Sequence, residues 1–195
     1  MENQLTMIEK IKDVLIFKDD GLFEINKKYI LYVGRFASFK RPDYIIQSLK
    51  QLDTNIELIL LGDGPNKDKL ELLVSDLELK SRVHFLGRVS NPYKYMKKAD
   101  IFVLSSKDGE GFPNVLAEAM VCKTAVISTD CISGPREILS PKSDINMTLA
   151  NKVEIAEFGI LTPVGDINNY KTSMNILYNE IYLWLIYILP NPFFL

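Results

Sequence analysis

Residues 29–62 read YILYVGRFASFKRPDYIIQSLKQLDTNIELILLG. Two apolar runs, YILYVG and ELILLG, each end in glycine, and Ile45, Ile46 and Leu49 stand between them at helical spacing after Pro42. A strand that is apolar at every position is buried on both faces, which is typical of a parallel sheet. The stretch therefore predicts a strand, a helix and a second strand joined by a right-handed crossover.

The same alternation of apolar runs and helical patterns continues along the chain. It predicts a single α/β domain over residues 29–180, a Rossmann-like doubly wound parallel sheet with helices on both faces. Ligands of such sheets bind at the carboxyl ends of the strands, so the residues after each strand are the candidates for function. The further strands expected are 83–86, 101–104, 125–128 and 159–161, and the helices are 66–77, 92–98, 115–120 and 170–181.

Three segments depart from this alternation. Residues 1–28 look like a linker with one amphipathic stretch, Ile8–Phe17, and residues 140–157 predict a polar loop or insertion. Residues 181–195 form an apolar tail, shorter than the roughly 20 residues that a membrane-spanning helix needs. We expect the tail to pack on the domain, and a peripheral contact with the inner face of the membrane is the alternative.

Composition excludes some classes of function. The chain has 195 residues and a net charge of −2, so it offers no bulk attraction to nucleic acid. Cys122 and Cys131 form neither a disulfide framework nor a metal-ligand spacing, which favours a reducing, cytoplasmic setting. His84, inside an expected strand, is expected to be structural.

Glycines and cations follow the first three strands. Gly34, Arg35 and Lys40 come after the first strand, where arginine can grip a diphosphate and lysine adds a point charge. Gly62-Asp63-Gly64 and Gly87-Arg88 follow the next two. A basic surface loop and ordinary tight turns would explain the same residues. The dinucleotide fingerprint is absent from this sequence, which counts against an NAD-dependent enzyme.

The fourth strand is followed by SSKDGEGFPNVLAEAM, residues 105–120. Glu110 stands just before an expected helix whose free N–H groups near Asn114 could meet a phosphate. Glu118 lies within that apolar helix, where a buried carboxylate needs a partner such as a ribose diol. The alternative is one glutamate that stabilises the helix dipole and another on the surface.

These motifs together resemble a known family. Glu110-GFPNVLA-Glu118 resembles the paired-glutamate signature of the retaining family 4 glycosyltransferases. The other elements of the resemblance stand in the same order as in that family's C-terminal domain, one half of the GT-B fold. They are Gly34-Arg35 with Lys40, Gly62-Asp63-Gly64, Val83-His84-Phe85-Leu86-Gly87 and Gly134-Pro135-Arg136-Glu137, and the match runs from Tyr29 to Asp166.

The resemblance implies a donor site for a UDP- or GDP-sugar, with no metal or other cofactor. Arg35 and Lys40 would hold the diphosphate and stabilise the leaving group, Glu110 would contact the sugar, and these three would be the catalytic residues. Glu118 would contact the ribose. The implied donor-binding residues are Gly34, Arg35, Lys40, Gly62, Gly64, Phe85, Arg88, Glu110, Gly111, Phe112, Asn114, Val115 and Glu118.

The implied reaction is retaining hexosyl transfer to a saccharide or lipid-linked acceptor in surface polysaccharide or glycan assembly. A complete enzyme of this family also has an acceptor-binding domain, whereas about 28 residues precede the first strand here. We therefore expect a separate acceptor-binding domain as a partner, in a split or truncated enzyme. The alternative is a non-catalytic nucleotide-binding fragment.

Overall fold

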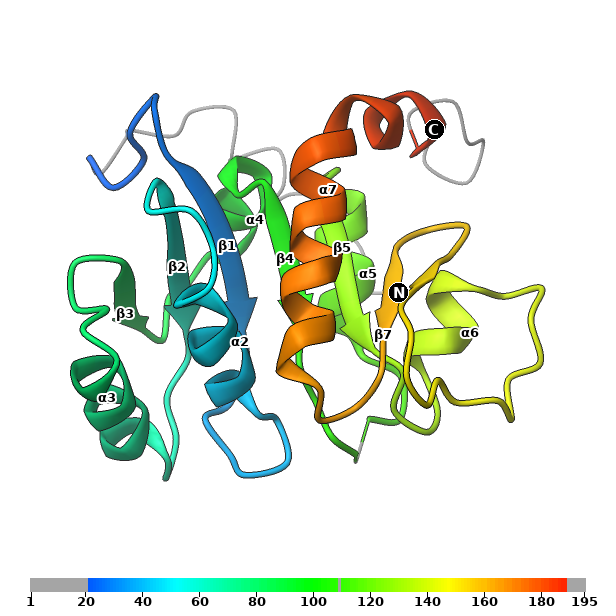
Figure 1. Cartoon of the computed structure of the whole chain (residues 1–195), viewed down its shortest axis with the longest axis horizontal. Coiled ribbons are helices and arrows are strands. Elements are labelled where there is room, and N and C mark those ends of the chain that lie inside the picture. Colours follow the sequence, from blue (N-terminus) through cyan, green and yellow to red (C-terminus); the bar gives the residue numbers. More distant parts are fainter. Residues whose placement is uncertain (1–20, 109, 189–195) are drawn as a thin grey trace.

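The computed structural model describes residues 21–108 and 110–188. In this part of the chain a sheet lies between two layers of helices (Figure 1). The strands are β1 (Lys28–Val33), β2 (Ile56–Leu61), β3 (Val83–Gly87), β4 (Ile101–Leu104), β5 (Ala125–Thr129), β6 (Glu154–Ile155) and β7 (Ile160–Thr162). The helices are α2 (Pro42–Leu49), α3 (Lys67–Asp76), α4 (Tyr93–Lys98), α5 (Asn114–Val121), α6 (Pro135–Leu139) and α7 (Ile167–Ile188).

The strands form one sheet in the order β3-β2-β1-β4-β5-β7-β6. Every neighbouring pair from β3 to β7 is parallel, and β1 and β2 are in register from Lys28 and Ile56 to Val33 and Leu61. The strand order reverses direction at β1, because after β3 the chain crosses back over the sheet and adds β4 on the other side of β1. The predicted Rossmann-like doubly wound sheet is therefore confirmed, and its carboxyl ends lie at the lower edge in Figure 1.

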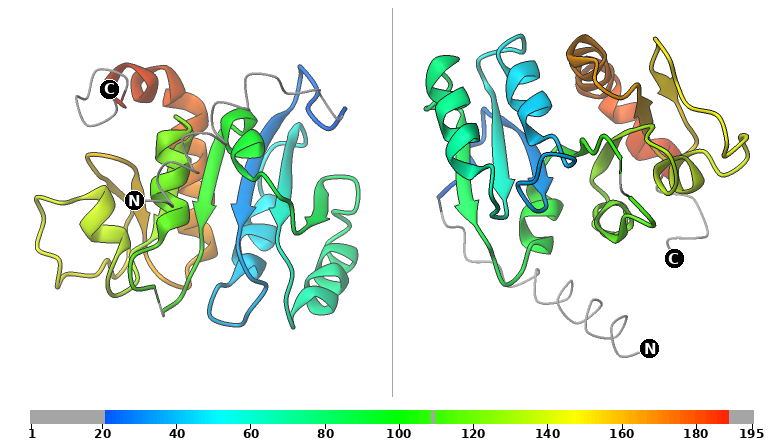
Figure 2. Two further views of the ribbon diagram at one scale, coloured as in Figure 1. Left: turned by 180° about the vertical axis from the view of Figure 1, so that it is seen from behind. Right: turned by 90° about the horizontal axis from the view of Figure 1, so that it is seen from below.

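Each face of the sheet carries its own core. Residues of α2, α3 and α7 pack with one set of strand side chains, including Ile30 and Leu58. Residues of α4, α5 and α6 pack with the opposite set, including Leu31 and Ile59. The alternation of Ile30 and Leu31 between the two cores is the period-two alternation of a strand with both faces covered. Figure 2 shows α4 and α5 from behind, on the face opposite α2.

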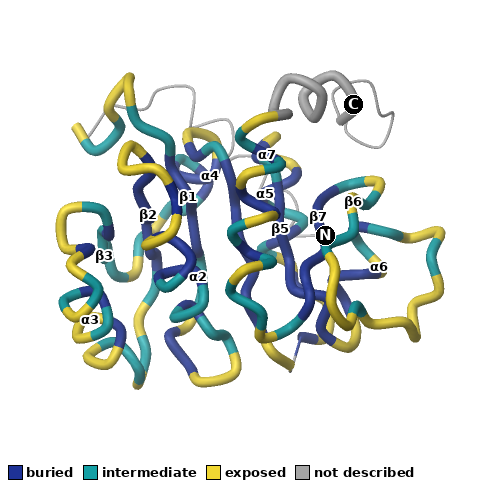
Figure 3. Tube along the Cα trace, viewed as in Figure 1, coloured by how far each residue is buried: buried dark blue, intermediate teal, exposed yellow. Residues whose placement is uncertain are grey.

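One strand pair departs from the predicted parallel sheet. The segment 140–157, expected to be a loop, contains β6, which pairs antiparallel with β7. The two strands are joined by a tight hairpin in which the Ala156 N–H donates to the Gly159 carbonyl at 2.8 Å. A strand of two residues carries too little apolar pattern to be recognised in a sequence. The preceding loop is largely exposed, as Figure 3 shows between α6 and β6.

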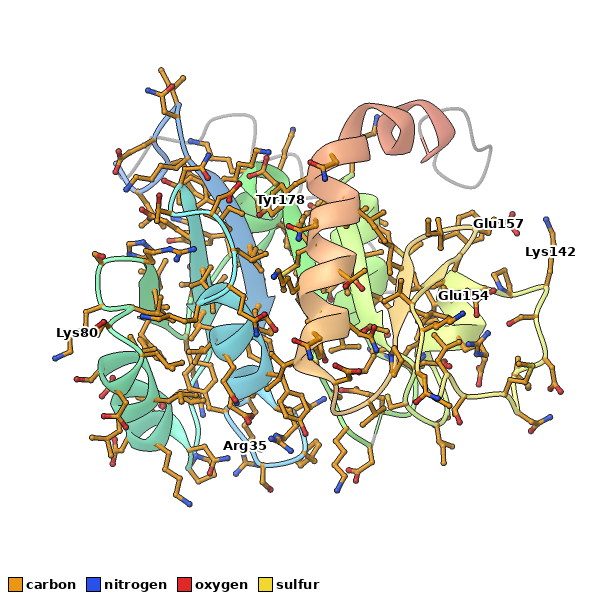
Figure 4. The ribbon with its side chains drawn as sticks, in the orientation of Figure 1. Arg35, Lys80, Lys142, Glu154, Glu157 and Tyr178 are labelled. Carbon is orange, nitrogen blue, oxygen red and sulfur yellow. The ribbon has the colours of Figure 1, made fainter. Side chains whose placement is uncertain are left out.

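A buried ion pair ties this loop to the sheet. The Arg136 guanidinium donates to both oxygens of Asp130, at 3.0 and 2.6 Å, and to Glu154 of β6 at 3.0 Å. The side chains of Arg136 and Asp130 are 4% and 1% exposed. Farther from the sheet, Lys142 forms a solvent-accessible ion pair with Glu157 (Figure 4). The Asp130–Arg136 pair could not be predicted from the sequence, because it depends on how the loop after β5 is placed against α6.

Near both ends of the described chain, the structure adds detail to what was expected for residues 1–28 and 181–195. Lys28 belongs to β1, one residue earlier than expected, and Leu22 and Phe23 pack against the α4–α5 core. The last helix, α7, begins at Ile167 because the Asp166 carboxylate accepts hydrogen bonds from the N–H groups of Asn168 and Asn169, as an N-cap does. It continues through the first eight residues of the apolar tail, to Ile188. The amphipathic stretch Ile8–Phe17 and residues 189–195 lie outside the described residues.

His84 is part of a charged cluster at the other end of the sheet. Its Nε2 donates to Oε2 of Glu57 at 2.6 Å, and the Lys27 ammonium donates to Oε1 of the same carboxylate. Burial disfavours the charge of Glu57, but the hydrogen bonds from Lys27 and His84 outweigh it and hold its pKa below the usual range. This geometry gives His84 a structural partner away from the carboxyl ends of the strands.

Candidate functional site

A cavity opens at the carboxyl ends of β1, β2 and β3. Its volume is about 380 Å³. Arg35 and Arg88 line it, and among the described residues neither guanidinium makes a hydrogen bond or an ion pair with another side chain. Figure 4 shows Arg35 at this edge of the sheet. The complete lining is Val33, Gly34, Arg35, Leu61, Gly62, Asp63, Arg88, Val89 and Pro92.

The glycines of the first two turns allow the two loops to meet. A Cβ on Gly62 would stand 1.9 Å from the Gly34 carbonyl oxygen, and the backbone φ of Gly62 is +142°. A Cβ on Gly64 would stand 2.6 Å from the Phe36 carbonyl oxygen. Both positions therefore require glycine for contact between loops of the chain itself. Gly34 and Gly62 also line the cavity, whereas Gly64 does not.

A second cluster forms where the loop after β1 meets the loop after β4. The Lys40 ammonium and the Ser106 hydroxyl both donate to Oε1 of Glu110. The Ser105 hydroxyl donates to the Lys40 carbonyl at 2.8 Å, and the Lys107 N–H donates to the Phe39 carbonyl. The structure thus brings together two of the three residues predicted to be catalytic. Arg35, the third, lies on the same β1–α2 loop.

The loop after β5 holds Glu110 from the other side. The Ser133 hydroxyl donates to the Glu110 carbonyl at 2.6 Å. Gly134, whose φ is +88°, packs so closely that a Cβ there would stand 2.5 Å from the Gly111 carbonyl oxygen. Pro135 then begins α6, and the Glu137 side chain accepts a hydrogen bond from the Gly134 N–H. Loops from β1, β4 and β5 therefore converge on Glu110.

The backbone after Glu110 is open to a ligand. Nothing lies within 4 Å of where a Gly111 Cβ would be, and Phe112 is 60% exposed. Asn114 begins α5 and is exposed, and Val115 is half-buried. The amino end of α5 consequently presents its first N–H groups beside an open glycine backbone, an arrangement suited to an anion.

Glu118 is half-buried on α5 and faces α4. Burial raises the pKa of the Tyr93 hydroxyl on α4, and the negative charge of Glu118 raises it further. Tyr93 follows Pro92, which lines the cavity. Glu118 thus acts on the first residue of α4, directly after the cavity-lining Pro92, and does not itself line the cavity.

Phe85 lies apart from these groups. Its ring packs edge-on against Phe36, with the two centroids 6.1 Å apart, next to the α2–α3 core. It does not line the cavity. The predicted contact of Phe85 with the nucleotide base stays a prediction. Arg88, directly after the end of β3, is the residue of this segment that lines the cavity.

The charge of Glu110 affects buried groups beneath it. Burial raises the pKa of the Tyr32 hydroxyl, and the nearby Glu110 carboxylate adds to the effect. Burial likewise raises the pKa of the Cys131 thiol to about 11, with Glu110 again contributing. Ser106 and Ser133 contact Glu110 directly but were not among the predicted residues. A polar residue just beyond an apolar strand, as Ser106 is two residues after the end of β4, is the available signal in the sequence.

The described residues hold no candidate metal centre and no candidate membrane span. They contain no group of three or more His, Cys, Asp or Glu side chains arranged to hold a metal ion. None of their helices combines the length and the hydropathy that crossing a bilayer requires.

Known proteins resemble this chain in sequence and in fold. An uncharacterized glycosyltransferase of Methanocaldococcus jannaschii is 39% identical over 153 residues, which are 75% of this chain and 35% of that protein. A Campylobacter jejuni protein is 37% identical over 145 residues, 74% of this chain and 36% of its own length. It is named N-acetylgalactosamine-N,N'-diacetylbacillosaminyl-diphospho-undecaprenol 4-alpha-N-acetylgalactosaminyltransferase. The chain therefore spans about a third of these curated relatives.

A solved structure shows the same fold. Anabaena HepE, crystallised with UDP and glucose, superposes with a TM-score of 0.67 at 23% identity, covering 84% of this chain and 41% of HepE. The predicted fold, the C-terminal half of a GT-B glycosyltransferase, is confirmed. The family described as "Glycosyl transferases group 1" matches residues 15–158. With its Arg35–Arg88 cavity and its Lys40–Glu110 pair at the carboxyl ends of the strands, this chain belongs to the group 1 glycosyltransferases.

Proposed function

We propose that this chain binds the nucleoside diphosphate sugar of a glycosyl transfer reaction, a UDP- or GDP-sugar. The observation that carries the proposal is the pair of arginines, Arg35 and Arg88, that line one cavity without a partner in the described part of the chain. Two cations in one cavity suit a diphosphate, which arginine binds bidentately. The HepE structure, which holds UDP and glucose, supports the proposal.

The diphosphate would extend from Arg35 and Arg88 toward Lys40 and the amino end of α5, and the sugar would lie toward Glu110. Gly111 leaves room for this approach. Cationic side chains and a helix N-terminus can neutralise a leaving diphosphate, so we propose that no metal is needed. Transfer would retain the anomeric configuration, as in family 4, with the leaving diphosphate taking the acceptor proton on the same face.

The acceptor site is proposed to lie on a separate domain. The acceptor would be a saccharide or a lipid-linked glycan in surface polysaccharide assembly, and the C. jejuni relative, named for an undecaprenol-linked substrate, supports this. We place the chain in the cytoplasm, at the inner face of the membrane where lipid-linked acceptors are held. Both cysteines, Cys122 and Cys131, are free and buried, which fits a reducing compartment.

Calorimetry on the folded chain tests donor binding. We expect UDP or GDP to bind, and a matching nucleotide sugar to bind more tightly than the nucleotide. If neither UDP nor GDP binds to a sample that shows a cooperative thermal transition, the proposal is refuted. A second candidate is donor binding without transfer, because the chain spans about a third of its relatives. Transfer after addition of an acceptor-binding domain would exclude that candidate.

A further inference from the structure

The carboxylate of Glu110 is held by one of its two oxygens. The Lys40 ammonium and the Ser106 hydroxyl both donate to Oε1, and no donor among the described residues reaches Oε2. Glu110 is 7% exposed, so water has limited access to it. A carboxylate has about four acceptor positions, and a buried one needs them used. Oε2 is therefore the oxygen that remains for a ligand.

Ser106 is itself fixed from behind. It is fully buried two residues beyond the end of β4, and its carbonyl accepts a hydrogen bond from the Thr129 hydroxyl at 2.5 Å. Thr129 is the last residue of β5. The donor to Glu110 is thus anchored to two adjacent strands of the sheet. Lys40 reaches the same oxygen on a long side chain that is 21% exposed and carries a charge of its own.

We propose that Ser106 is a positioning residue, which holds Oε1 of Glu110 so that Oε2 accepts a hydroxyl hydrogen of the donor sugar. The inference rests on the proposed function, because it concerns the same donor site. The Ser106 hydroxyl contacts Glu110 and no cation, so its effect falls on the sugar and leaves the diphosphate contacts intact. This gives the residue an energetic signature that a purely structural serine lacks.

Titration calorimetry on the whole chain with two ligands measures this difference between nucleotide-sugar affinity and nucleotide affinity. The ligands are UDP and whichever of UDP-glucose, UDP-galactose and their N-acetyl forms binds wild type most tightly; GDP and GDP-mannose take their place if the chain prefers guanine. Removing a hydrogen bond to a charged group should lower nucleotide-sugar affinity about tenfold in Ser106→Ala. Affinity for the nucleotide alone should stay within about twofold. Ser106→Cys keeps the side-chain size with a weaker donor, and its nucleotide-sugar affinity should be intermediate.

Ser48→Ala is the matched control. Ser48 is also fully buried, but its hydroxyl donates to the Tyr44 and Ile167 carbonyls, in contact with α7. This variant should bind both ligands as wild type does. Equal losses for nucleotide and nucleotide sugar in Ser106→Ala would overturn the positioning role, and so would unchanged nucleotide-sugar affinity. In both cases donor binding by wild type would leave the proposed function standing, whereas a wild type that binds neither ligand would end both.

Discussion

Lys40 and Glu110 stand 70 positions apart in the sequence, and the ammonium of one donates to Oε1 of the other. The family resemblance implies different roles for the two, with Lys40 at the diphosphate and Glu110 at the sugar. Their contact means that each partly neutralises the other at the junction of the β1–α2 and β4–α5 loops. A diphosphate would therefore compete with Glu110 for the charge of Lys40.

This competition predicts opposite effects of one substitution. Glu110→Gln removes the competing charge, so affinity for the free nucleotide should rise by roughly threefold to tenfold, or about 1 kcal/mol. Affinity for the nucleotide sugar should fall relative to the nucleotide, because a charge-assisted hydrogen bond is lost. Calorimetry with both ligands measures the two effects. Asp108→Asn, at an exposed carboxylate of the same loop, should change neither, and a drop in nucleotide affinity for Glu110→Gln would contradict the competition.

Two arginines of the β1–α2 loop should differ sharply in nucleotide binding. Arg35 lines the cavity without an ion-pair partner among the described residues, so Arg35→Ala should weaken binding by about 2 kcal/mol, or roughly thirtyfold. Arg41 is already paired with Asp43 and stacked on the Tyr44 ring, 3.7 Å from its centroid. Arg41→Ala makes the same charge change and should leave affinity within about twofold. Equal losses in the two variants would show that only net charge matters.

Two glycines near the site should separate stability from binding. A Cβ at Gly111 meets open space, so Gly111→Ala should leave the melting temperature unchanged and weaken nucleotide-sugar binding by obstructing the approach. A Cβ at Gly62 would collide with the Gly34 carbonyl, and its φ of +142° disfavours any side chain. Gly62→Ala should cost more than about 2 kcal/mol of unfolding free energy. Denaturant unfolding and calorimetry on both variants test the contrast, and normal donor affinity for Gly111→Ala would place the ligand elsewhere.

The buried and exposed ion pairs of the α6–β7 region should contribute very unequally to stability. Arg136→Met leaves Asp130 buried without its cation and should cost about 3–5 kcal/mol. Lys142→Met removes a pair in which the lysine is 84% exposed, and should cost less than about 1 kcal/mol. Urea unfolding of the two variants measures the difference. A loss below about 1 kcal/mol for Arg136→Met would mean that solvent reaches Asp130 in its absence.

The Glu57 cluster predicts a loss of stability in acid. Because the pKa of Glu57 in the folded chain lies below its usual value of 4.5, its stabilising effect is complete above that pH. The effect declines as pH falls below 4.5 and disappears once pH passes the folded-state pKa. Thermal melts at several pH values should therefore show a smaller acid loss for Glu57→Gln than for wild type. Glu78→Gln, at a carboxylate that is 86% exposed, should follow the wild-type curve.

The parts of the fold that the sequence predicted share a physical cause. Strands β1, β2 and β4 are apolar at nearly every position because both of their faces are covered, and such runs are visible without a structure. The strand β6 has two residues and α6 has five, so neither shows a period. Arg136 of α6 pairs with Glu154 of β6 and with Asp130, which follows β5, and no local sequence pattern predicts these contacts.

The candidate site shows the same division. Arg35, Lys40 and Glu110 were recognised as residues that follow strands, and the structure places Lys40 against Glu110. What the sequence could not show is that Ser106 and Ser133 hold Glu110, since a serine after a strand or in a loop has many roles. The sequence leaves Gly62 and Gly64 open between donor binding and ordinary tight turns, and it does not show that a side chain at either position would collide with the β1–α2 loop.

The position of α7 bears on how the chain is made. Its residues Tyr170, Met174 and Leu177 complete the core that Ile45 and Leu49 of α2 begin. Because α2 leaves the ribosome well before α7, the part of α2 that packs on α7 stays uncovered until α7 has been synthesised. Exposed apolar surface of this kind invites aggregation or chaperone binding. The nascent chain can finish this core only after Leu177 has left the exit tunnel.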